Sequence, residues 1–182
     1  MSVVRYRLDE LDRIRWVSES WTAFARANGA PELAEPGILG RSLWTFVAGI
    51  ETRHLYELIF EAVRRDERTV VVPFRCDAPE LRRFMELEVR ACPHAELELT
   101  ASLLREEARS PEALLDARAP RGSEVVAICS VCKRLHVEGD RWLAVEQAVA
   151  ALDLFGRVEL PHLSHGLCPD CDRRVRRLVT GP

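Results

Sequence analysis

The sequence predicts an α+β fold: a five-stranded antiparallel sheet with helices on one face, followed by a small helix-containing C-terminal element. Three observations support this. Apolar residues first recur at helical spacing and later alternate with polar ones, so helices and strands occupy separate stretches. Four paired cysteines lie near the C-terminus. The 182 residues, 47% hydrophobic and 30% charged, suffice for one medium domain and a small appended element.

The first predicted elements are two short strands and a short helix. Over residues 5–18, apolar side chains alternate on either side of an acidic turn, which predicts two strands joined closely. Ser18 is placed to cap the helix that follows, and Asn28-Gly29 to end it. A loop containing proline and glycine then covers residues 30–40.

A short helical turn, a longer helix and three strands follow. Residues 42–47 predict the turn, and residues 51–65 predict the helix, because apolar residues recur there at intervals of three and four. The pattern then changes to β-branched residues over 69–75 and to strict alternation over 84–90 and 97–101. Both patterns are typical of strands, which completes a set of five.

The C-terminal part begins after a charged segment. Residues 105–123 contain two prolines and a glycine, so we predict a linker with one helical stretch over 111–117. A short strand over 125–128 leads into the first cysteine pair. An amphipathic helix is predicted over 141–154, and the second cysteine pair opens a last helix over 172–179.

The composition and motifs of the sequence exclude several classes of function. The net charge of −3 gives no general attraction for nucleic acid. No apolar run reaches the about 18–20 residues of a membrane span, and the N-terminus becomes charged too soon for a signal peptide. We therefore expect a cytoplasmic protein without membrane contact. A glycine-rich phosphate loop and a nucleophile motif are both missing from the sequence, so no enzyme activity is predicted.

The cysteines carry the strongest motif. Four of the six form two Cys-x-x-Cys pairs, and these are the predicted metal ligands: Cys129, Cys132, Cys168 and Cys171. Each pair directs two sulfurs to one point, and four thiolates suit the tetrahedral preference of zinc. Such a site leaves no open coordination position, so we expect structural zinc. Cys76 and Cys92 stand alone and are expected as small apolar side chains.

Three other interpretations of this region stay open. One or both cysteine pairs could cycle between dithiol and disulfide as a thiol redox sensor. A catalytic metal with only three protein ligands would make the protein an enzyme. A nucleic-acid-binding zinc ribbon could use the basic run that follows the last cysteine: Arg173, Arg174, Arg176 and Arg177. His165, three residues before Cys168, could replace a cysteine as ligand, hydrogen-bond a sulfur or cap the helix.

The N-terminal order of elements resembles that of a PAS domain, and four short stretches are similar to bacterial PAS sensors: residues 6–9, 21–25, 40–44 and 74–79. The resemblance covers residues 5–107. It implies a PAS-like sensory domain over 1–107 that senses a small ligand or mediates protein contacts, and it makes a homodimer plausible. It does not say which ligand the pocket holds.

Residues 126–175 are similar to a cysteine-rich tail that follows PAS, GAF and receiver domains in bacterial signalling proteins. The match departs only in a longer stretch over 155–163. It implies a zinc-binding element over 124–182, joined by a linker over 108–123. The two resemblances together imply a bacterial sensor or adaptor without its own output domain. Its expected partner is another signalling protein, such as a histidine kinase, rather than nucleic acid.

Two further features of the sequence are candidate ligand sites. Arg75, Asp77, Arg82 and Arg83 surround one turn and could hold an anion, although such clusters are usually solvated salt-bridge networks. His54 lies near the start of the longer helix, where some PAS domains ligate haem. We expect it to be an exposed surface residue.

Overall fold

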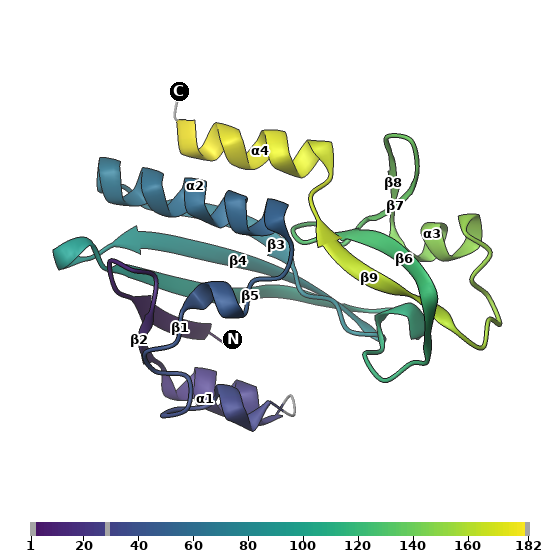
Figure 1. Ribbon diagram of the computed structural model, residues 1–182, viewed down its shortest axis with the longest axis horizontal. Coiled ribbons are helices and arrows are strands. Elements are labelled where there is room, and N and C mark those ends of the chain that lie inside the picture. The colour runs from purple at the N-terminus through teal and green to yellow at the C-terminus, as the bar shows by residue number, and fades with distance from the viewer. Residues whose placement is uncertain (1–2, 28–29, 181–182) are drawn as a thin grey trace.

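The computed structural model describes residues 3–27 and 30–180 and confirms an α+β fold (Figure 1). Its first sheet has five antiparallel strands in the order β2-β1-β5-β4-β3. Their bounds are β1 Val3–Leu8, β2 Ile14–Val17, β3 Val70–Arg75, β4 Leu81–Ala91 and β5 Leu97–Ala108. None of the helices in the described part of the chain is long and apolar enough to cross a membrane.

The helices of the first part begin within one residue of the predicted positions. Helix α1 spans Glu19–Ala27, and the backbone N–H of Trp21 donates to the Ser18 hydroxyl at 3.3 Å, which confirms the predicted cap. Its predicted end at Asn28-Gly29 lies outside the described residues. A 3₁₀ turn and the longer helix α2 (Ile50–Asp66) follow, as expected.

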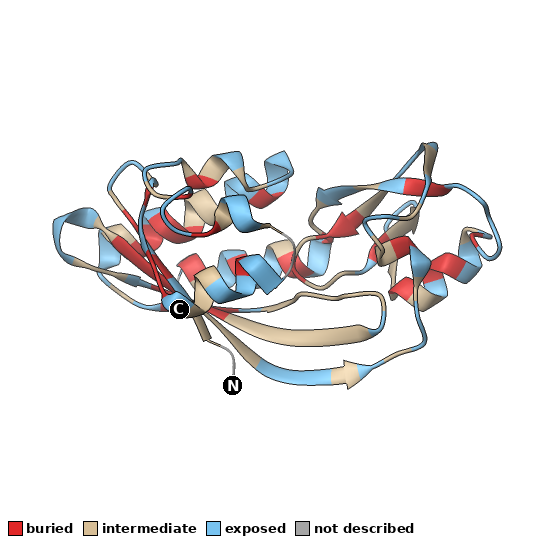
Figure 2. Ribbon diagram, turned by 90° about the horizontal axis from the view of Figure 1, so that it is seen from below, coloured by how far each residue is buried: buried red, intermediate tan, exposed pale blue. Residues whose placement is uncertain are grey.

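Helices α1 and α2 cover the same face of this sheet. Tyr6 lies opposite Leu99 in the β1–β5 register, and by the β4–β5 register Leu87 projects on the same side. Trp21 of α1 packs against Tyr6, with ring centroids 5.1 Å apart. Ile59 of α2 lines a cavity together with Leu87. The buried side chains of sheet and helices therefore form one layer between them. Figure 2 colours the buried residues of these elements red.

A second sheet, which the sequence analysis missed in part, organises the C-terminal region. It contains β6 (Arg121–Cys129), β7 (Leu135–Glu138), β8 (Arg141–Leu143) and β9 (Leu160–Gly166) in the order β8-β7-β6-β9. Strands β6 and β9 run parallel, and the other neighbours run antiparallel. Helix α3 (Val145–Ala151) packs on this sheet around a small core of its own.

Two predicted elements are wrong in their extent. The helix predicted over 141–154 starts only at Val145, because Trp142 pairs with His136 in a hairpin between β7 and β8. The segment 105–123, predicted as a linker with a helical stretch, loses both of its ends to strands, while a 3₁₀ helix at Ala113–Leu115 lies within the predicted helical stretch over 111–117. Strand β5 continues to Ala108 because β4 is long enough to pair with it, and β6 already begins at Arg121.

The last helix, α4 (Pro169–Thr180), lies beside α2 and contacts β3 (Figure 1). Val175 and Val179 belong to the same buried cluster as Tyr6 and Leu55 of the N-terminal part. Burying each of these valines contributes about 1.5–3 kcal/mol. The C-terminal region therefore completes the core of the first sheet. The predicted domain boundaries themselves stay a prediction.

Buried ion pairs also connect the C-terminal region to the first part of the chain. The Arg109 side chain, 1% exposed, lies 3.1 Å from Asp77 and 2.8 Å from Glu146 at the start of α3. Elsewhere in the first sheet, the 4% exposed carboxylate of Glu98 accepts hydrogen bonds from Arg7 at 2.7 Å and Arg90 at 3.0 Å. Charges taken out of water in this way need such partners.

Candidate metal centre

The two cysteine pairs come together because two turns meet at one end of the second sheet. Cys129 is the last residue of β6, and Cys132 lies in the turn to β7, which is closed by a hydrogen bond from the Lys133 N–H to the Cys129 carbonyl at 3.0 Å. In the parallel β6–β9 register Cys129 lies opposite Gly166. Cys168, which lies between the end of β9 and the start of α4, is therefore placed beside the first pair.

The geometry of the sulfurs fits a tetrahedral metal ion. The four Sγ atoms lie within 4.8 Å of one another, and those of Cys132 and Cys168 are 3.6 Å apart. Zinc–sulfur bonds of about 2.3 Å at tetrahedral angles place the sulfurs about 3.8 Å from each other. Three of the four cysteines are buried, so a bound ion would be closed off from solvent. These residues could hold a metal ion.

The pKa values of the thiols are also consistent with metal binding. Hydrogen bonds from Cys132 and Cys171 lower the pKa of Cys129 strongly. The thiolate thereby formed raises the pKa of Cys132 to about 12 and that of Cys171 still further. Several negative charges within a few ångströms repel one another, so the protein alone opposes full deprotonation. A divalent cation at the centre would offset this repulsion.

Backbone groups surround the sulfurs. The Cys168 N–H points at the Cys129 sulfur from 3.4 Å, and the backbone N–H of Arg134 donates to the Cys132 sulfur. The Arg174 guanidinium lies 3.8 Å from the Cys171 sulfur. Donors of this kind stabilise thiolates and orient metal ligands.

His165 does not join the sulfur cluster. The potential ligand atoms that group together are the four cysteine sulfurs alone, among the residues that the structure describes. His165 ends up in β9, where its side chain lines a neighbouring cavity. Loss of solvent there, and secondarily the charge of Lys133, lower its pKa, which favours the neutral imidazole at pH 7.

Most of the charged groups that the sequence singled out pair with oppositely charged groups of the chain. Arg75 pairs with Asp77, and Arg83 lies 3.0 Å from Glu106. In the basic run, Arg173 and Arg176 pair with acidic residues of their own helix at 2.7 and 2.9 Å. These arginines form salt-bridge networks in the structure.

Sequence reasoning missed a link between the cysteine turn and the first part of the chain. The hydroxyl groups of Thr52, in the first turn of α2, and Ser130, between the first two cysteines, are 2.6 Å apart. Gly49, which precedes α2, approaches the backbone of His165 so closely that a Cβ atom there would lie 2.3 Å from its carbonyl oxygen. No sequence signal marks either contact, because the partners are far apart in the chain.

Searches against protein-family models and against curated proteins found no match for this chain. The interpretation of the cysteine centre therefore rests on its own geometry and chemistry.

Proposed function

We propose that this chain is a cytoplasmic sensor or adaptor of bacterial signal transduction, in which a PAS-like domain is held to a zinc-binding element. The observation that carries the proposal is the closed, largely buried cluster of four sulfurs. A site with four thiolate ligands leaves zinc no position for an activated water. The metal is then structural, and the protein works by binding rather than by catalysis.

The structural role of zinc follows from what the cysteines connect. One pair belongs to the β6–β7 turn and the other to the start of α4, which completes the core around α2. The second sheet has a small core of its own, and small elements of this size commonly need a metal or disulfide to fold. Zinc would fix the position of α4 against the first sheet.

The strand order and internal space support the PAS-like part. The order β2-β1-β5-β4-β3 with helices over one face agrees with the resemblance of residues 5–107. Two adjoining cavities of about 390 and 400 Å³ lie on that face and share Phe74 and Cys76 in their walls. Ligand binding there would alter contacts with a partner signalling protein, or with a second copy in a dimer.

A thiol redox sensor is the second candidate, favoured by the 3.6 Å separation of sulfurs from different pairs. Cys132 and Cys168 need little movement to form a disulfide of about 2.05 Å. Oxidation would then replace metal as the link between the two turns.

Elemental analysis of the purified, untagged protein decides between them. About one zinc per chain, with the four clustered thiols unreactive until a chelator is added, supports the structural site. Absorption of a cobalt-substituted sample should then show four-sulfur tetrahedral coordination. A folded, metal-free sample whose thiols all react at once would contradict the zinc proposal and favour redox sensing.

A further inference from the structure

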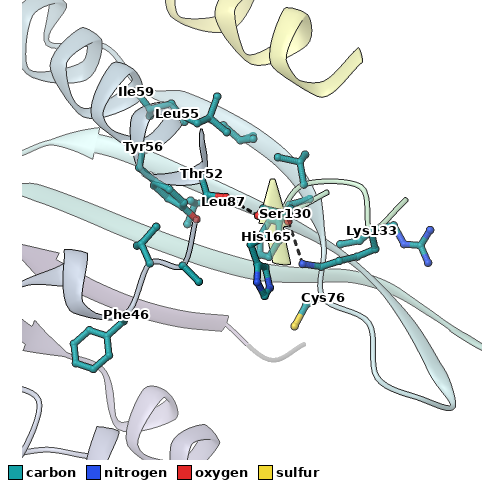
Figure 3. Close-up of a pocket in the computed structure, with 16 residues that line it drawn as sticks. Phe46, Thr52, Leu55, Tyr56, Ile59, Cys76, Leu87, Ser130, Lys133 and His165 are labelled. Atoms are coloured by element: carbon teal, nitrogen blue, oxygen red, sulfur yellow. Dashed lines mark hydrogen bonds between the residues drawn. The ribbon is translucent and has the colours of Figure 1, made fainter. Parts of the chain in front are cut away.

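One of the two cavities is built jointly by both parts of the chain. It measures about 390 Å³ and lies between the first sheet, α2 and the cysteine turn (Figure 3). Apolar side chains of the first part form most of its wall: Phe46, Leu55, Tyr56, Ile59, Val72 and Leu87. The C-terminal element contributes the polar end, with Ser130, Lys133 and His165. Apolar walls with a few polar groups at one end are typical of small-molecule sites.

Lys133 gives this end a positive charge that forms no ion pair with a carboxylate of the described residues. Its ammonium donates to the Ser130 carbonyl oxygen at 3.1 Å, and Figure 3 shows the ring of His165 beside it. An ammonium has three N–H donors. Within the described residues no carboxylate lies within ion-pair distance of Lys133, and the cavity wall contains no Asp or Glu. Arg75, the other cation in the wall, is already paired with Asp77.

The backbone at Lys133 is strained within the cysteine turn. Its φ of 61° lies in the left-handed region, where glycine is less strained than any residue with a side chain. A lysine at this position combines a strained conformation with a charge that has no carboxylate partner at the wall of an apolar cavity. Strain of this kind is common at ligand sites.

We propose that this cavity binds a small organic anion with an apolar body, its carboxylate held by Lys133 and its body lying between α2 and the first sheet. The inference rests on the proposed function, because the turn that carries Lys133 is built around the metal site. The volume is at the lower end for small-molecule sites, which suits a ligand of about a dozen non-hydrogen atoms. The cysteine element then forms part of the ligand-binding site, in addition to holding the C-terminal part of the chain against the first sheet.

Octanoate and octan-1-ol are matched probes for this site, since they share the chain length and differ in charge. We expect isothermal titration of the zinc-loaded full chain to show octanoate binding on the order of 10- to 100-fold tighter than octan-1-ol. Lys133→Met should abolish this preference. Lys133→Gly, which relieves the backbone strain, should do the same in a turn that folds at least as well.

The neighbouring cation supplies the control. Arg134 follows Lys133 in the same turn, but its side chain is exposed and pairs with Asp170 at 3.3 Å. Arg134→Met should keep the full preference for octanoate. Val47→Phe, which fills the cavity from the first part of the chain, should weaken both probes by similar factors.

Several results would overturn the inference. Equal affinity for the two probes, no binding of either, or unchanged octanoate binding in Lys133→Met or Val47→Phe would each do so. A Lys133→Met protein that loses zinc but keeps its octanoate preference would show that this lysine only balances the charge of the metal centre. Zinc is measured in every sample, so a wild-type protein without metal refutes the proposed function, whereas one zinc per chain without charge preference refutes only this inference.

Discussion

Gly49→Ala tests whether the C-terminal element is packed against α2 as tightly as the structure indicates. Gly49 has φ 87° and ψ 133°, a region that is costly for any residue with a side chain. In addition, the new Cβ would lie 2.3 Å from the carbonyl oxygen of His165, well inside the 3.0 Å that real Cβ atoms keep. Because that oxygen is backbone, β9 or the start of α2 must shift.

The expected loss of stability has two parts. The backbone conformation costs about 1–3 kcal/mol for alanine, and forcing two packed segments apart costs a further about 1–3 kcal/mol. The total of about 2–6 kcal/mol is a large share of the about 5–15 kcal/mol of a typical protein. Gly40→Ala is the matched control. Gly40 also has a positive φ, of 77°, but no atom lies within 4 Å of its would-be Cβ, so we expect only about 1–2 kcal/mol.

Urea unfolding followed by tryptophan fluorescence measures both variants. The two proteins and the wild type are compared at the same free zinc concentration, because a bound metal ion would contribute to stability. We expect Gly49→Ala to be less stable than Gly40→Ala by about 1–3 kcal/mol. A difference below about 0.5 kcal/mol, within the error of such extrapolations, would refute the close approach of β9 to α2.

Three further predictions concern the metal, pH and the buried ion pairs. Cys171→Ser should bind zinc at least about 10-fold more weakly, as measured with a competing chelator, whereas Cys76→Ser, outside the cluster, should bind it normally; equal affinities would contradict the assigned ligand set. Burial opposes the ionisation of Glu98, but hydrogen bonds from its two flanking arginines outweigh it and lower its pKa. Its contribution to stability is therefore present above the unfolded pKa of about 4.3 and is lost as the pH falls through the lower folded pKa. Glu98→Gln should flatten the stability profile in that acidic range, and an unchanged slope there would count against the pairing. Arg109→Met should cost up to about 3–5 kcal/mol in urea unfolding because it removes the fully buried cation between Asp77 and Glu146, which then keep one arginine each, Arg75 and Arg82. The 91% exposed Arg118, changed in the same way, should cost at most about 1 kcal/mol, and similar losses in the two variants would argue against a buried network.

The predictable part of the fold is the part with long, regular patterns. Helix α2 spans 17 residues whose apolar positions repeat at helical spacing, and its predicted bounds differ by one residue at each end. The second sheet left weaker signals. Strands β7 and β8 have four and three residues and are held by their pairing, which a single sequence does not display. The helical spacing of Trp142 with Val145 and Val149 suited a strand followed by a helix equally well.

Strand β9 was hard to predict because it contains a proline. Pro161 argues against a strand over residues 155–163, because proline cannot donate a hydrogen bond to a central ladder. Strand β9 nevertheless contains it, and β9 is at the edge of its sheet, where the missing N–H costs little. The cysteine cluster was predictable because its spacing is local within each pair. The polar end of the cavity was not, since Thr52 and Leu55 are distant in sequence from Lys133.

The position of α4 bears on how the protein is made. Val175 and Val179 complete a core whose other members, such as Tyr6 and Leu55, are synthesised early. At about 5–20 residues per second, a ribosome needs about 4–14 s to proceed from the end of β5 to this helix. During that interval α4 is not yet available to pack against α2, so apolar side chains of α2 stay exposed to solvent. A nascent chain stalled at this stage would be a substrate for chaperones, and the exposure would end when α4 packs against α2.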